Sequence, residues 1–94
     1  MGSVSIQLSN IKDVEESEFT YEIAGEASLF DMLNTWGAQH APSLRERLFD
    51  PESGGIATTI LILKNGRSVK SEDPKTTMVS PGDVLMIMPI LVGG

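Results

Sequence analysis

The chain has 94 residues, of which 40% are hydrophobic and 21% are charged, and its formal net charge is −6. This length and composition predict one globular domain, and the negative charge disfavours nucleic acid and anionic membranes as partners. Cysteine is absent, which excludes disulfides, thiolate metal sites and a cysteine nucleophile. Histidine occurs once, which disfavours a histidine metal centre and a Ser-His-Asp catalytic site.

Two segments near the start of the chain alternate apolar and polar residues, which is the pattern of half-buried strands. In the first, residues 4–9, the apolar positions are Val4, Ile6 and Leu8, and in the second, residues 18–23, they are Phe19, Tyr21 and Ile23. Because residues 10–17 between them are mostly polar, the two strands are expected to pair as a hairpin.

The next two segments predict helices on one face of the sheet. Residues 28–36 place Leu29, Met32, Leu33 and Trp36 on one helical stripe. Ser28 is the expected N-cap and Gly37 the expected end of this main helix. Residues 43–49 predict a short second helix, which would begin with a capping box between Ser43 and Glu46 and end before Pro51.

The last third of the chain reads as strands and turns. Residues 58–64 predict a strand buried on both faces, followed by a hairpin turn at Asn65-Gly66 and a short strand over residues 67–70. A turn at residues 80–83 leads into a final strand at residues 84–89, which is the most apolar of all and therefore belongs in the sheet interior. The order of elements predicts an α+β fold with its helices on one face of the sheet.

The chain ends on a proline, three apolar residues and two glycines: Pro89, Ile90, Leu91, Val92, Gly93 and Gly94. Since proline cannot donate to a strand ladder, we expect regular pairing to stop near Pro89 and a flexible tail to occupy about residues 89–94. Glycine lacks a Cβ, so a carboxylate on Gly94 would be able to enter a narrow channel of another protein.

This ending resembles the MoaD/ThiS family of ubiquitin-like sulfur carriers, with a Gly-Asp turn at Gly82-Asp83, a hydrophobic strand, a proline-containing tail and Gly93-Gly94. The segments "ILILKNGR" and "PSLRERLFD" are also similar to that family, the second to its molybdopterin-synthase small subunits. The resemblance implies one β-grasp (ubiquitin-like) domain over residues 1–94. It would have a mixed four- to five-stranded sheet with one main helix and one short helix packed on one face.

The resemblance also implies a mechanism in which no side chain of this protein is catalytic. An ATP-dependent, MoeB/ThiF-like activating enzyme would adenylate the Gly94 carboxylate, and a sulfur donor would convert it to a thiocarboxylate. The residues from Pro89 to Gly93 would thread into the partner, and a synthase large subunit would accept the sulfur. The protein would then be a cytoplasmic carrier and substrate rather than an enzyme, with no bound cofactor or metal.

The sequence leaves the acceptor and the pathway open. A molybdopterin or tungstopterin precursor is favoured by the short second helix and the length, while "RLFDPESGG" also resembles carriers that serve cysteine synthesis. Thiamine thiazole is a further acceptor. Two other functions use the same features differently: a ubiquitin-like modifier would join Gly94 to lysines, and a plain interaction domain would not use the tail.

The remaining polar residues have ordinary explanations. Lys64, Arg67 and Lys70 form a small basic cluster at the predicted hairpin, which either contacts an acidic partner or is simply solvated. His40, Asp31, Glu18 and Glu22 are expected at the surface. Gly54-Gly55 lacks the Lys-Ser/Thr that follows the glycine in a phosphate loop, so it is predicted to be a plain connector.

Overall fold

The computed structural model describes residues 2–9, 18–69 and 72–90, and the structural statements below refer to these residues. They form two helices and seven strands: β1 (Gly2–Leu8), β2 (Glu18–Ile23), β3 (Ala27–Ser28), α1 (Leu29–His40), α2 (Pro42–Leu48), β4 (Ile60–Lys64), β5 (Arg67–Ser68), β6 (Met78–Val79) and β7 (Val84–Pro89).

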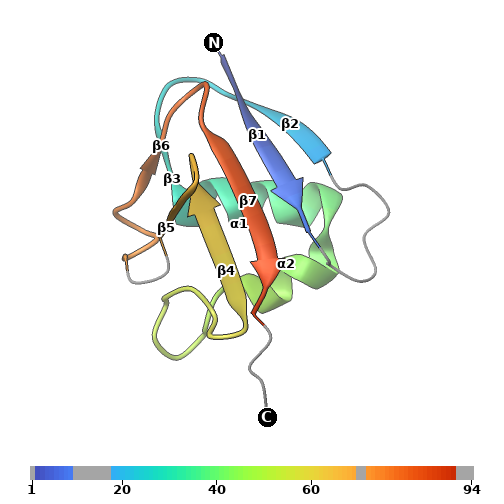
Figure 1. Cartoon of the computed structure of the whole chain (residues 1–94), viewed down its shortest axis with the longest axis vertical. Coiled ribbons are helices and arrows are strands. Elements are labelled where there is room, and N and C mark those ends of the chain that lie inside the picture. The colour runs from blue at the N-terminus through green and yellow to red at the C-terminus, as the bar shows by residue number, and fades with distance from the viewer. Residues whose placement is uncertain (1, 10–17, 70–71, 91–94) are drawn as a thin grey trace.

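Five of the strands form one mixed sheet in the order β2-β1-β7-β4-β5 (Figure 1). β1 and β7 pair in parallel, whereas the β1–β2, β4–β7 and β4–β5 pairs are antiparallel. The most apolar strand, β7, therefore lies in the middle of the sheet, as the sequence predicts. β3 and β6 form a separate two-stranded sheet that the sequence analysis missed, because two residues are too short to show a periodicity.

One face of the sheet carries both helices, which lie behind the strands in Figure 1. The core between the two layers includes every apolar residue of the predicted α1 stripe, with Leu29, Leu33 and Trp36 each 0% exposed. The α+β fold with a main and a short helix on one face is confirmed. Neither described helix is long and apolar enough to cross a lipid bilayer.

α1 does not end at Gly37, as predicted, but continues to His40. Gly37 is buried within the helix, and a Cβ built on it would lie 2.8 Å from the Cβ of Arg45 in α2. Real side chains do not approach this closely, so the glycine lets the second helix pack tightly against the first. The physical reason for this glycine is close approach rather than helix termination.

The start of α2 also differs from the prediction. α2 begins at Pro42 with Ala41 as its N-cap, and no side-chain hydrogen bond caps it, so the predicted capping box of Ser43 and Glu46 is wrong. Proline fits the first helical turn because its missing N–H would have had no helical partner there. In contrast, the Ser28 cap of α1 is confirmed, since its Oγ accepts a hydrogen bond from the Asp31 N–H at 3.1 Å.

Candidate functional site

The end of β7 is anchored further along the chain than its proline suggests. Pro89 is still part of β7 and pairs with Ile60, and the Ile90 N–H donates to the Thr59 carbonyl at 2.8 Å. Regular pairing therefore ends at Pro89, as the sequence predicts, and one further hydrogen bond holds Ile90. Leu91, Val92, Gly93 and Gly94 lie outside the described residues.

The register explains why Pro89 does not break the strand. The Val84 carbonyl and the Ile90 N–H both bond toward the β4 side, so the even-numbered residues of β7 face β4. Pro89 is odd-numbered and faces β1, whose last pair with β7 is Leu8 with Ile87. The missing N–H of the proline therefore removes no hydrogen bond to β4, and the β1–β7 ladder ends with the bond from the Ser9 N–H to the Ile87 carbonyl.

An apolar surface lies on the sheet face opposite the helices. Leu61 and Leu63 of β4 pair with Met88 and Met86 of β7, and all four side chains are only partly buried. We call these four residues the apolar panel. The prediction that β4 is buried on both faces is wrong, because Ile60 and Ile62 enter the core while their neighbours face outward. The panel shares β7 with the anchored start of the tail.

The other half of the same open face is polar. Gln7 of β1 lies beside Met86 of β7, and on its other side it pairs with Glu18 of β2. The next row places Ser5 between Val84 and Thr20. The open face thus changes from apolar over β4 and β7 to polar over β1 and β2, so the apolar panel has a defined border.

The two turns at the upper end of the sheet are joined to each other. Asn65 Oδ1 accepts a hydrogen bond from the Val84 N–H at 2.8 Å, and its Nδ2 donates to Asp83 Oδ1 at 3.0 Å. The other carboxylate oxygen of Asp83 accepts from the Ser80 N–H at 2.8 Å. Partial burial alone would raise the pKa of Asp83, but the Ser80 and Asn65 hydrogen bonds and the Lys64 charge outweigh it and hold that pKa below its ordinary value.

The predicted basic cluster does not face the apolar panel. Lys64 follows Ile60 and Ile62 in strand alternation, so its side chain leaves on the helix side, where Nζ donates to the Met78 carbonyl at 3.0 Å. Arg67 pairs with Lys64 across the hairpin and is exposed. Lys70 lies outside the described residues. Contact between the basic cluster and a partner therefore stays a prediction. Lys64 and Arg67, the two described residues of the cluster, lie on the other side of the sheet from the apolar panel.

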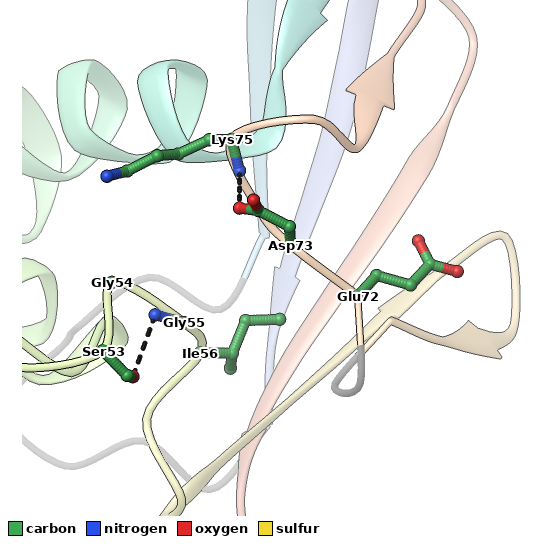
Figure 2. A pocket seen from close by; sticks show the side chains of 7 residues that line it. All are labelled: Ser53, Gly54, Gly55, Ile56, Glu72, Asp73 and Lys75. Atoms are coloured by element: carbon green, nitrogen blue, oxygen red, sulfur yellow. Dashed lines mark hydrogen bonds between the residues drawn. The ribbon is translucent and has the colours of Figure 1, made fainter.

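The loop with Gly54-Gly55 borders a pocket of ≈ 490 Å³ (Figure 2). The Gly54 N–H donates to the Asp50 carbonyl and the Gly55 N–H to Ser53 Oγ, so neither amide is available to cradle a phosphate. Across the pocket, Asp73 Oδ1 accepts the backbone N–H of Lys75, whose ammonium lies 5.3 Å from the centre of the Phe30 ring. These hydrogen bonds join groups within the same loop, which agrees with the prediction that Gly54-Gly55 is a plain connector.

The other polar residues lie where the sequence predicts. Asp31, Glu18, Glu22 and His40 are exposed, and the His40 ring is 5.6 Å from that of Phe19. Among the residues that the structure describes, no three His, Cys, Asp or Glu side chains gather in a way that would hold a metal ion.

Comparison with known proteins gives structural neighbours only. No family model and no curated relative matches the chain. SAMP1 from Haloferax volcanii is 25% identical with a TM-score of 0.75, over 99% of this chain and 100% of that one. Urm1 from Trypanosoma brucei is 13% identical with a TM-score of 0.74, over 99% and 96% of the two chains. CysO, solved in a BexX/CysO complex from Amycolatopsis orientalis, is 23% identical with a TM-score of 0.73, over 97% and 99%.

These neighbours match the chain over nearly its whole length and are ubiquitin-like proteins of the sulfur-carrier or modifier type. They agree with the resemblance based on the Gly82-Asp83 turn and the Gly93-Gly94 ending. The chain is a ubiquitin-like β-grasp protein, and its structural neighbours include SAMP1, Urm1 and CysO.

Proposed function

We propose that this protein is a sulfur carrier whose Gly94 carboxylate is adenylated by an ATP-dependent activating enzyme and then converted to a thiocarboxylate. The proposal rests above all on the end of β7, a central strand that is anchored through the Ile90 N–H and leads directly into Leu91, Val92, Gly93 and Gly94. A rigid strand followed by a short glycine-ended tail can present a main-chain carboxylate to a partner while the domain itself stays folded.

The length of the tail limits where the activating enzyme can bind. Four residues extend by at most about 14 Å, so the nucleotide site of the enzyme has to come within that distance of Ile90. The apolar panel of Leu61, Leu63, Met86 and Met88 is the apolar surface that shares β7 with the tail. We therefore assign the panel as the docking surface for the activating enzyme. Methionine suits this role because its flexible thioether adapts to different partner surfaces.

An adenylation assay tests the proposal directly. With a MoeB/ThiF-like enzyme and ATP, the full chain should support exchange of label between pyrophosphate and ATP, whereas a chain lacking Gly94 should not. The Ser53→Ala variant is a suitable control because Ser53 is exposed and far along the chain from the tail. Equal exchange with and without Gly94 would contradict the proposal.

The acceptor of the sulfur is the finer part of the proposal. We propose a molybdopterin or tungstopterin precursor first, with an activated serine and the thiamine thiazole as the acceptors to compare in the same assay. Each is offered to the thiocarboxylate form with the matching synthase, and the sulfur-containing product is measured. Transfer to a different acceptor would replace the pterin assignment and leave the carrier function in place.

Two of the neighbours are called small archaeal modifier proteins, which makes protein modification the second function to test. A modifier would transfer the same activated acyl group to lysine amines. In cell lysates it would give a ladder of conjugates that disappears when Gly93 and Gly94 are deleted. A carrier without modifier activity gives no such ladder.

A further inference from the structure

The open edge of the sheet at β2 carries an inference that does not depend on the tail. β2 lies at the end of the strand order and pairs with β1 alone among the described strands. The opposite edge strand, β5, has only two residues, whereas β2 has six. A regular edge strand of this length offers unpaired main-chain groups to another chain.

The register shows which groups these are. The Ser5 and Ser9 N–H groups donate to carbonyls on the β7 side, so the odd-numbered residues of β1 face β7. The even-numbered residues of β1 therefore bond to β2, and their partners there are Phe19, Tyr21 and Ile23. It follows that Thr20 and Glu22 turn their N–H and C=O groups outward, away from the sheet.

A groove of ≈ 280 Å³ lies directly beside this edge, between β2 and α1. Its apolar lining includes Ile23 and Met32, which are 9% and 3% exposed. Glu26 and Asp31 are exposed and supply carboxylates, and the lining contains no Lys, Arg or His side chain. The groove therefore combines an apolar floor with a negative rim, next to main-chain groups that can extend the sheet.

We propose that the β2 edge and this groove bind an extended basic segment of a partner protein by strand addition. The added strand would pair with the outward groups of Thr20 and Glu22. Alternate side chains of the segment would face the groove, where an aliphatic residue contacts Ile23 and Met32, and a Lys or Arg on either side meets Glu26 and Asp31. The net charge of −6 adds long-range attraction for such a segment.

The probe for this proposal is the capped peptide Thr-Arg-Thr-Val-Thr-Arg-Thr, and its control has Glu in place of both Arg residues. Amide hydrogen exchange of the full chain is followed by NMR with up to about 1 mM peptide. The Thr20 and Glu22 amides should exchange about twofold more slowly at half saturation, because only the added strand protects them. The Tyr21 amide already faces β1 and serves as the internal reference. The acidic peptide should protect neither outward amide.

Variants separate the two parts of the interaction. The Glu26→Gln/Asp31→Asn double variant should bind the basic peptide about fivefold more weakly, and the Glu46→Gln/Glu52→Gln double variant, on exposed positions outside the groove, should bind normally. Thr20→Pro removes an outward donor without removing a β1 hydrogen bond, so it should weaken binding about fivefold or more. If Thr20→Pro does not fold, the comparison of Glu26→Gln/Asp31→Asn with Glu46→Gln/Glu52→Gln still tests the binding of the basic peptide.

Four outcomes would overturn the proposal. One is unchanged exchange at Thr20 and Glu22 at the highest peptide concentration. The second is equal binding of the basic and acidic peptides, and the third is a set of spectral changes confined to the apolar panel. The fourth is protection that rises with protein concentration in the absence of peptide, which would assign the edge to a second copy of this chain. None of these results bears on adenylation at Gly94, so the two proposals fail independently.

Discussion

The Asn65 side chain holds the Asp83 carboxylate at 3.0 Å although the two residues are eighteen positions apart, and this bond joins the β4–β5 turn to the turn that starts β7. Asn65 has a φ of 53° and Gly66 of 84°, so the hairpin turn has the backbone that this residue pair favours. The Asn-Gly and Gly-Asp motifs thus have a structural role in this chain, because they fix the start of the strand that ends at the tail.

Replacing Asn65 by glycine should lower the free energy of unfolding by about 1–2 kcal/mol. Glycine accepts the positive φ without strain, so the loss reports the hydrogen bonds to Asp83 and Val84 together with the greater freedom of glycine in the unfolded chain. Urea denaturation measures the change. Asn65→Asp is the comparison, since it keeps an acceptor for the Val84 N–H but sets a second carboxylate beside Asp83. A free energy of unfolding unchanged in Asn65→Gly would show that the two turns are not coupled.

The stability of the protein should fall at acid pH in part through Asp83. The folded pKa of this group is lowered, so its contribution is fully present above the ordinary Asp pKa of about 3.9 and is lost as pH falls through the folded value. Denaturation of the native chain and of Asp83→Asn across this acid range tests the effect. The difference in free energy of unfolding between the two should shrink toward low pH. A difference that stays constant would mean that the charge of Asp83 contributes nothing.

Gly37→Ala should destabilise the protein even though alanine favours helices. Helix propensity alone predicts a gain of about 0.5–1 kcal/mol at an interior glycine. The new Cβ would, however, approach the Arg45 Cβ to 2.8 Å, and overpacking of this kind costs about 1–3 kcal/mol. Thermal denaturation gives the sign of the change. A raised melting temperature would mean that α2 shifts away without cost.

The apolar panel can be tested separately from the tail. Met86→Glu and Leu63→Glu place a charge on partly buried positions of the open face, so the fold should persist while productive binding of the activating enzyme weakens at least about tenfold. Ser5→Glu is the matched control because it adds the same charge to the polar half of that face. KM for adenylation is the readout. Equal KM values for the panel variants and the control would remove the panel from the docking surface.

The sequence was sufficient for the elements whose periodicity spans several residues. The Leu29–Trp36 stripe, the alternating β1 and β2 segments and the central position of β7 are confirmed. The predictions at element ends were less successful, because they depend on tertiary contacts: Gly37 serves packing against Arg45, and Pro42 rather than Ser43 starts α2. β3 and β6 pair through two residues each, which no local pattern indicates.

For the candidate site, too, local patterns were visible in the sequence, whereas features that depend on tertiary contacts were not. The run of apolar residues in β4 and β7 was evident from the sequence, but its alternation between core and open face depends on which face the helices cover. The acidic groove beside β2 was not predicted, because Ile23, Glu26 and Asp31 meet only when β2 and α1 are placed side by side. Two of the predicted basic residues, Lys64 and Arg67, were correctly found at a hairpin, but only the register reveals that they face away from the apolar panel.

The chemical state of the last residue is the most direct test of the carrier proposal. The protein is purified from cells with its activating enzyme and a sulfur source present, and its intact mass and C-terminal fragment masses are recorded. Our account predicts that one oxygen is replaced by sulfur in the fragment that contains Gly94, and that hydrolysis restores the original mass. A chain that supports sulfur transfer in full while its Gly94 remains an ordinary carboxylate, is extended or is missing would contradict it.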